Sequence, residues 1–148
     1  MSADASAALE FLVQRGLLRR VRADPSLASA RLLSAAEDLV DAHRPEIQPR
    51  NRFRIACNAA CSSSEALLVS YGYSCEPSVD DALQIAVGAL FTGTPAAMFA
   101  VTMHTLDQRR LETNDPELQG PSDLQFLQAV DDVQAMHDAI CIQVRTSA

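Results

Sequence analysis

Two pairs of metal-ligating residue types repeat at helical spacing in this sequence. Cys57 and Cys61 lie four residues apart, and so do His137 and Cys141. Residues at this spacing share one face of an α-helix, so two facing helices would bring three thiols and one imidazole together, a ligand set that suits zinc. The alternative is ordinary packing, because cysteine is among the most commonly buried residue types. The residues favour packing, and no metal or other cofactor is expected.

Arginine supplies a second candidate chemistry, since every basic residue in the chain other than histidine is arginine. Arg54 and Asn58 stand one turn apart, and Arg109 and Arg110 are adjacent in a later segment. Guanidinium groups bind phosphate through paired N–H donors, so these four are candidate phosphate- or nucleotide-binding residues. The alternative is a solvated helix face on which the arginines pair with nearby acids. Of the four cysteines, Cys75 is the expected reactive thiol because it follows the central helix in a predicted loop.

The cysteine pair and Arg54 belong to one long predicted helix over residues 50–73. Its small and apolar residues fall on one broad face at a period of 3.6, namely Phe53, Cys57, Ala60, Cys61, Ser64, Leu67, Leu68 and Tyr71. Small side chains let other helices approach closely, and Gly72 is expected to end the helix. We therefore expect this segment to be the centre of the packing.

Other helices are predicted on either side of it, with no convincing strand pattern. The first, in residues 5–22, is a short helix that is interrupted or ends near Gly16 and is followed by a basic connector. The others cover residues 25–43 (capped by Asp24), 79–91, 95–113 and 123–144 (capped by Ser122 or Asp123). The predicted apolar stripes are Leu27, Ala30, Leu33, Ala36 or Glu37, Val40 and Ala42 in the second helix, and Leu127, Val130, Val133 or Gln134, His137, Cys141 and Val144 in the last. The sequence thus predicts an all-α, compact bundle of about five to six helices. It forms a single domain over residues 1–148, with its core at about 17–145.

Composition and charge narrow the class of protein. Hydrophobic residues make up 48% and charged residues 21%, which is typical of a globular domain. No apolar run has membrane-spanning length, and Asp4 and Glu10 differ from a secretory signal, so a cytoplasmic protein with no membrane contact is expected. Residues 1–54 hold nine arginines against seven acids, whereas the rest holds three against twelve. The pI near 4.8 argues against broad nucleic-acid binding but leaves room for a local arginine patch.

Two consecutive segments, GLLRRVRADPSLASARLLSAAEDLVDAHRP and NRFRIACNAACSSSEALLVSYGY, carry a family resemblance. With their basic connector, long helix and closing Gly-Tyr pair, they resemble the start of a prokaryotic HEPN domain (higher eukaryotes and prokaryotes nucleotide-binding). The resemblance covers residues 17–113 and rests on Arg52, Phe53, Asn58, Ala59, Ala60, Leu67, Leu68, Gly72 and Tyr73. It implies a HEPN-like helical bundle, often a homodimer, with a nucleotidyltransferase-type partner in a bacterial toxin–antitoxin or defence system. Many members are metal-independent ribonucleases, so RNA or a nucleotide is an implied ligand.

The sequence departs from the family at the ribonuclease motif, in which histidine follows arginine by a few residues. Here Arg109 and Arg110 are followed by Asn114 and Asp115. RNA cleavage needs a group that exchanges a proton near neutral pH, and an ionised Asp115 donates poorly to a leaving oxygen. We therefore expect a non-catalytic binding or interaction module. The alternatives are a ribonuclease with an atypical site at Arg109, Arg110 and Asp115, and a zinc-stabilised structural protein. The homodimer expectation rests on the apolar residues 83–103.

Overall fold

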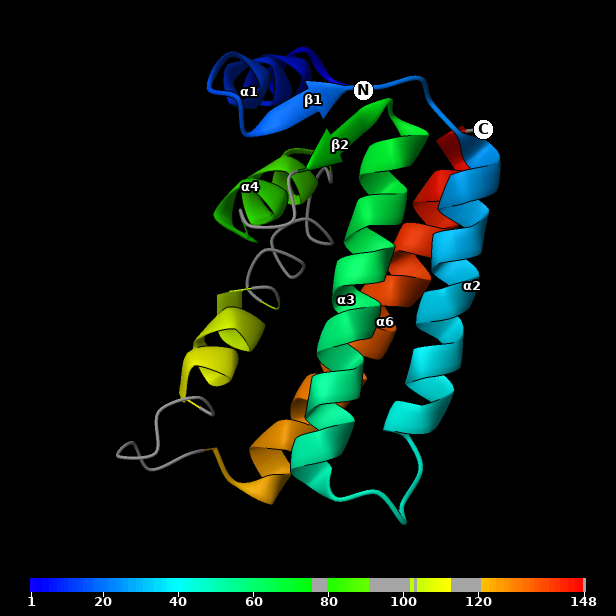
Figure 1. Cartoon of the computed structure of the whole chain (residues 1–148), viewed down its shortest axis with the longest axis vertical. Helices are drawn as coiled ribbons and strands as arrows, with labels where there is room; N and C mark the ends of the chain where they lie inside the picture. Colours follow the sequence, from blue (N-terminus) through cyan, green and yellow to red (C-terminus); the bar gives the residue numbers. More distant parts are fainter. Residues whose placement is uncertain (76–79, 91–101, 103, 113–120, 148) are drawn as a thin grey trace.

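The computed structural model of the chain describes residues 1–75, 80–90, 102, 104–112 and 121–147 (Figure 1). Its elements are α1 (Ala3–Gln14), β1 (Leu18–Arg20), α2 (Pro25–Ala42), α3 (Pro49–Ser70), β2 (Tyr73–Cys75), α4 (Asp80–Leu90) and α6 (Asp123–Ser147). Residues 104–112 form a further helix. The predicted compact all-α bundle is confirmed, with one small sheet added to it.

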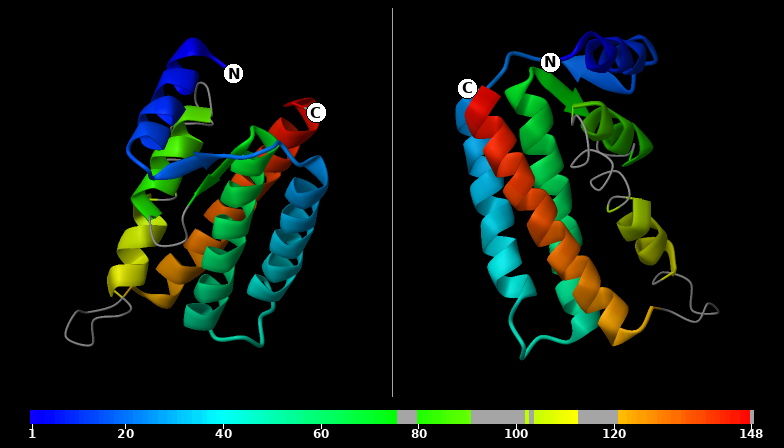
Figure 2. Two further views of the ribbon diagram at one scale, coloured as in Figure 1. Left: turned by 45° about the horizontal axis from the view of Figure 1, so that its top comes forward. Right: turned by 180° about the vertical axis from the view of Figure 1, so that it is seen from behind.

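Helix α3 is the centre of the packing, as predicted. It lies beside α2 and α6 along most of its length (Figures 1 and 2). Its buried residues are mostly small, and they are Phe53, Ala56, Cys57, Ala59, Ala60, Ser63, Ser64, Ala66, Leu67, Leu68 and Val69. The Phe53 ring packs against that of Phe126 on α6, with 5.2 Å between the ring centroids. Gly72 follows the helix at a φ of 84°, which confirms its predicted role as the helix stop.

Helix α2 begins where the sequence predicts but buries a different face. The Asp24 carboxylate accepts a hydrogen bond from the Leu27 amide at 2.9 Å, which confirms the predicted cap. The predicted stripe is wrong apart from Ala42, since the buried residues are Ala28, Ala35, Leu39 and Ala42. Leu27, Leu33 and Val40 are 41%, 64% and 64% exposed. The facing side of α3 is built of small residues, so alanine against alanine gives the closest approach and turns the larger side chains outward.

A two-stranded antiparallel sheet is the feature that the sequence did not predict. Leu18, Arg19 and Arg20 pair with Cys75, Ser74 and Tyr73 respectively. Residues 17–22 were expected to be helix end and connector, and residues 74–75 a loop. Strands of three residues are too short to display an alternating pattern, and they form here because Gly16, at a φ of 73°, and Gly72 turn the chain after α1 and α3. The sheet joins the ends of these two helices.

The last helix starts with reciprocal capping by Ser122 and Gln125. The Gln125 amide donates to the Ser122 hydroxyl at 3.3 Å, and the Ser122 amide donates to the Gln125 side chain at 2.8 Å. This confirms the predicted start of the last helix. Its buried face comprises Phe126, Ala129, Val130, Val133, Met136, His137, Ile140 and Val144, so the predicted Leu127 and Cys141 are only half-buried.

Helix α4 lies within its predicted span of residues 79–91. Leu83, Ala86, Val87 and Leu90 are buried, whereas Ile85 is 55% exposed. The apolar residues 91–101 behind the dimer expectation lie outside the described residues, and so do residues 114–120 of the loop that the sequence predicts at 114–122. Within the described part, no helix combines the length and apolarity needed to cross a membrane.

Candidate functional site

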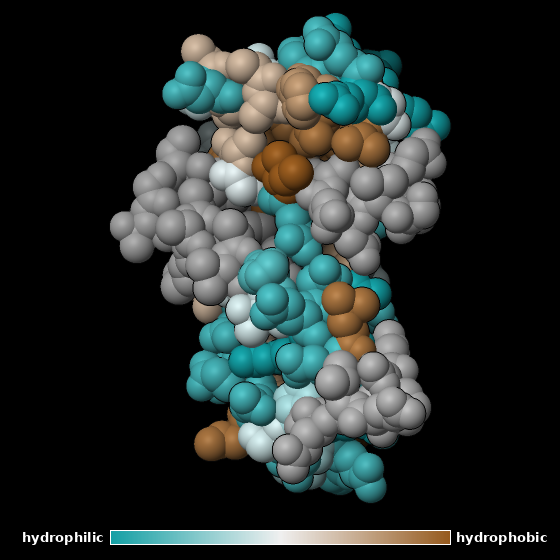
Figure 3. Space-filling model, turned by 90° about the vertical axis from the view of Figure 1, so that its left-hand side faces the viewer, coloured by the Kyte–Doolittle hydropathy of each residue, from teal (hydrophilic) through white to brown (hydrophobic). Residues whose placement is uncertain are grey.

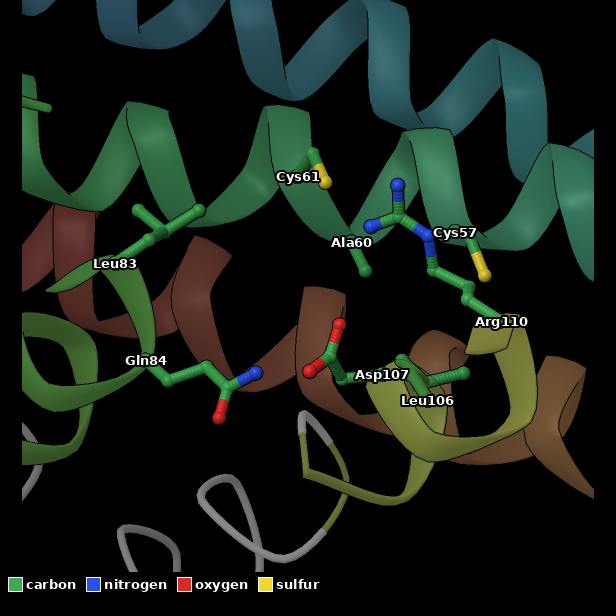
Figure 4. A pocket seen from close by; sticks show the side chains of 8 residues that line it. All are labelled: Cys57, Ala60, Cys61, Leu83, Gln84, Leu106, Asp107 and Arg110. Carbon is green, nitrogen blue, oxygen red and sulfur yellow. The ribbon is translucent and has the colours of Figure 1, made fainter. Parts of the chain in front are cut away.

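A small pocket brings together two of the four candidate metal ligands and one of the four candidate phosphate-binding residues. It lies between α3, α4 and the helix at 104–112, and its lining is Cys57, Ala60, Cys61, Leu83, Gln84, Leu106, Asp107 and Arg110 (Figure 4). The cavity volume of about 20 Å³ suffices for roughly one water molecule. The predicted cysteine pair and one predicted arginine therefore meet at the same place.

The local sequence explains how these side chains come to face one another. The four-residue spacing of Cys57 and Cys61 places both on one face of α3, as expected. Leu106 is buried and anchors the helix at 104–112, so that Asp107 and Arg110 lie along the same side of that helix. In Figure 4 the Arg110 side chain extends over α3 toward the two cysteines. The result is an apolar, thiol-lined floor with a guanidinium and a carboxylate at its edge.

Burial makes Cys57 a poor nucleophile. Cys57 is only 7% exposed, and its burial raises the pKa of the thiol to about 12. The positive charge of Arg110 opposes this rise in pKa, as does that of Arg109 to a smaller degree, but neither overcomes the desolvation of the thiolate. The Cys57 thiol therefore stays protonated near neutral pH, where only a thiolate would attack an electrophile or bind a metal readily.

The remaining predicted phosphate-binding residues do not line the pocket. Arg109 is half-buried, and its guanidinium donates to the Gln125 carbonyl at 3.0 Å, which ties the helix at 104–112 to the first turn of α6. Arg54 and Asn58 are exposed on α3. Asp115 lies outside the described residues. Of the predicted arginines, Arg110 is the one that the pocket brings to the cysteine pair.

The two metal-ligand pairs do not converge. Cys57 and Cys61 line the pocket beside α4, whereas His137 of α6 lines a separate groove between α2 and α6. Within the described residues, which include both pairs, there is no group of three or more His, Cys, Asp or Glu side chains placed to hold a metal ion. The four-ligand zinc site suggested by the spacing of these residues is therefore not formed, and none of the four cysteines, all within the described residues, is in a disulfide.

His137 instead lies between Ser63 and Cys141 in a hydrogen-bonded network of three side chains. Its Nδ1 lies 2.9 Å from the Ser63 hydroxyl oxygen, and its Nε2 lies 3.4 Å from the Cys141 sulfur. Ser63 is fully buried, and a buried hydroxyl must donate its hydrogen to avoid a large desolvation cost. Donation to Nδ1 places the ring proton on Nε2, facing the sulfur. Burial lowers the pKa of His137, with Asp138 opposing the shift, so the ring is neutral at neutral pH.

The sequence did not predict these hydrogen bonds among Ser63, His137 and Cys141, because the helical pattern placed Ser64, and not Ser63, on the buried face. Both serines are buried, and Ser64 donates to the Ala60 carbonyl at 2.8 Å. The signal in the sequence was the run of three serines inside a helix, which is unusual in a fully apolar core. Cys75, predicted to lie in a loop, is half-buried in β2, where its thiol donates to the Leu17 carbonyl at 3.7 Å.

The side of the molecule that is drawn in Figure 3 changes in hydropathy along its length. Figure 3 shows hydrophobic residues gathered toward the end where α1 and α4 lie, and a mainly hydrophilic surface toward the helix at 104–112. An arginine at the edge of a small, partly apolar pocket suits a ligand that combines a charged and an apolar part. No protein-family model, curated protein or solved structure matches this chain.

Proposed function

We propose that this chain is a non-catalytic, HEPN-like binding module that recognises a phosphate-bearing ligand, a nucleotide or RNA, at the edge of the pocket through Arg110. The observation that carries the proposal is the composition of the pocket lining, which combines an exposed arginine with two thiols but includes no imidazole. A guanidinium can bind a phosphate but cannot exchange a proton at physiological pH.

The buried thiol of the pocket, Cys57, does not supply the missing proton transfer. Cys57, with a pKa of about 12, releases its proton too reluctantly to act as a base or nucleophile near neutral pH. The neutral ring of His137 is bonded to Ser63 and Cys141 on another side of α3. Binding without cleavage is the chemistry that these groups support.

The wider setting of the proposal comes from the resemblance of residues 17–113 to HEPN domains. On that basis the chain forms a homodimer and acts with a nucleotidyltransferase-type partner in a bacterial toxin–antitoxin or defence system, in the cytoplasm. The acidic pI near 4.8 favours a localised ligand contact over binding along a long nucleic acid.

The proposal is tested with a fluorescently labelled, short single-stranded RNA and with ATP as competitor, at low salt. The Arg110→Ala variant removes charged hydrogen bonds worth about 1.5–3 kcal/mol, so its affinity falls by roughly 10- to 100-fold. Arg145→Ala is the matched control, because Arg145 is an exposed arginine in the last turn of α6. Equal affinities of the two variants would show that Arg110 is not the phosphate contact.

A further inference from the structure

A groove between α2 and α6 lies apart from the pocket and has no part in the proposed function. It has a volume of about 540 Å³, and its lining is Ala36, Leu39, Val40, His43, Gln134, His137 and Asp138. The right-hand view of Figure 2 shows the two helices running side by side on this face. A groove between two neighbouring helices has the shape that a third helix fills.

Apolar residues that the alanine core turns outward lie at and beside this groove: Val40 lines it, and helical spacing places Leu33 and Ile142 next to its lining residues. Leu33 and Val40 are seven residues apart and so share one side of α2, and each is 64% exposed. Ile142 on α6, one turn past Asp138, is also 64% exposed. A single exposed leucine is ordinary, but three large apolar side chains along one groove form a contact surface.

The charges around the groove are mainly negative. Asp138 lines it, and the exposed Asp131 lies seven residues earlier on the same side of α6. On α2 the exposed Glu37 lies between Leu33 and Val40. Arg44 already pairs with Asp41 at 3.1 Å. Arg145 lies two turns past Asp138, beyond the middle of the groove.

Both histidines of the groove make side-chain hydrogen bonds within the protein. His43 bonds through Nε2 to the Gln134 side-chain oxygen at 3.2 Å. Burial lowers the pKa of His137, which keeps that ring neutral. The groove is therefore lined by apolar residues on α2 (Ala36, Leu39 and Val40) together with polar side chains, and carboxylates lie on both helices.

We propose that this groove binds an amphipathic helix of another protein, one with lysine or arginine along both edges of an apolar stripe. The apolar stripe covers Leu33, Val40 and Ile142, and the basic edges meet Glu37, Asp131 and Asp138. A second copy of this chain fits less well, because a two-fold interface would place this acidic face against itself.

The test uses the full chain and a labelled synthetic amphipathic helix of leucine and lysine. Two control peptides are needed: a scrambled sequence of the same composition, and a leucine–glutamate peptide with the same apolar pattern. Wild-type protein binds the first peptide at least tenfold more tightly than either control. Equal binding of the scrambled peptide would reduce the effect to charge attraction and overturn the proposal.

Two substitutions separate the apolar contribution to peptide binding from the electrostatic one. Val40→Glu adds a negative charge, so attraction by charge alone would strengthen binding, whereas an apolar groove predicts a loss of tenfold or more. Glu37→Lys weakens binding severalfold, and Ile85→Glu, an exposed control on α4, leaves it unchanged. All three positions are exposed, and circular dichroism checks that each variant is folded. Unchanged binding by Val40→Glu, or light scattering that shows a wild-type dimer broken by this substitution, overturns the proposal.

Discussion

Replacing Gly72 with alanine tests how the end of α3 is joined to the sheet. At a φ of 84°, an added Cβ at this position would lie 3.1 Å from the Val21 carbonyl oxygen. That oxygen cannot easily move, because the amide of Val21 donates to the carbonyl of Gly72 at 2.9 Å. Gly16 offers a matched control, since its φ is 73° but a Cβ there meets nothing within 4 Å.

Alanine at either glycine therefore loses stability because of the left-handed backbone, but only alanine at Gly72 also meets a close contact. A left-handed conformation costs an alanine about 1 kcal/mol at either position. The close approach at Gly72 adds about 1–3 kcal/mol, as overpacking of a rigid contact typically does. Gly16→Ala should thus lose about 1 kcal/mol and Gly72→Ala about 2–4 kcal/mol in the free energy of unfolding. For a chain of this size each kcal/mol lowers Tm by roughly 2–4 °C.

Urea unfolding of both variants, followed by far-UV circular dichroism, measures these differences. Equal losses for Gly16→Ala and Gly72→Ala would refute the close approach of Val21, just after β1, to Gly72 at the end of α3. That result would matter for the site as well, because β2 leads from α3 toward α4, which supplies Leu83 and Gln84 to the pocket.

Two further predictions concern the buried polar groups. Ser63→Ala leaves Nδ1 of His137 without a donor and should lower the free energy of unfolding by about 1–3 kcal/mol, whereas Ser70→Ala, at a half-buried helix end, should cost less in the same urea titration. The raised pKa of Cys57 means that the unfolded chain loses this proton before the folded chain does. Stability should therefore fall as pH rises from about 9 toward about 12, and Cys57→Ala should remove most of that slope; an unchanged slope would show that other groups cause it.

Local signals explain what the sequence predicted correctly. Asp24 before Pro25 fixes the start of α2, Gly72 fixes the end of α3, and Ser122 with Gln125 starts the last helix. Each of these depends on a few adjacent residues and on backbone geometry, so a single sequence contains the information needed.

Tertiary contacts explain the features that the sequence did not predict. The buried face of α2 depends on the small residues of α3, which favour Ala35 at the contact and leave Leu33 outside. The spacing of Cys57 and Cys61 predicted a shared face, but nothing local predicted that Arg110 would lie beside them. The bond between Ser63 and His137 joins residues 74 positions apart, and such a contact depends on how whole helices pack.

The central claim, ligand binding without cleavage at the Arg110 pocket, is tested most directly by the length of an RNA after incubation with the protein. A labelled single-stranded RNA is incubated without divalent metal, at a protein concentration that saturates binding, and is then separated by denaturing gel electrophoresis. The account predicts that the RNA stays at full length. Shortened RNA with the wild-type protein, and intact RNA with Arg110→Ala, would contradict it and make the chain a ribonuclease with an atypical site.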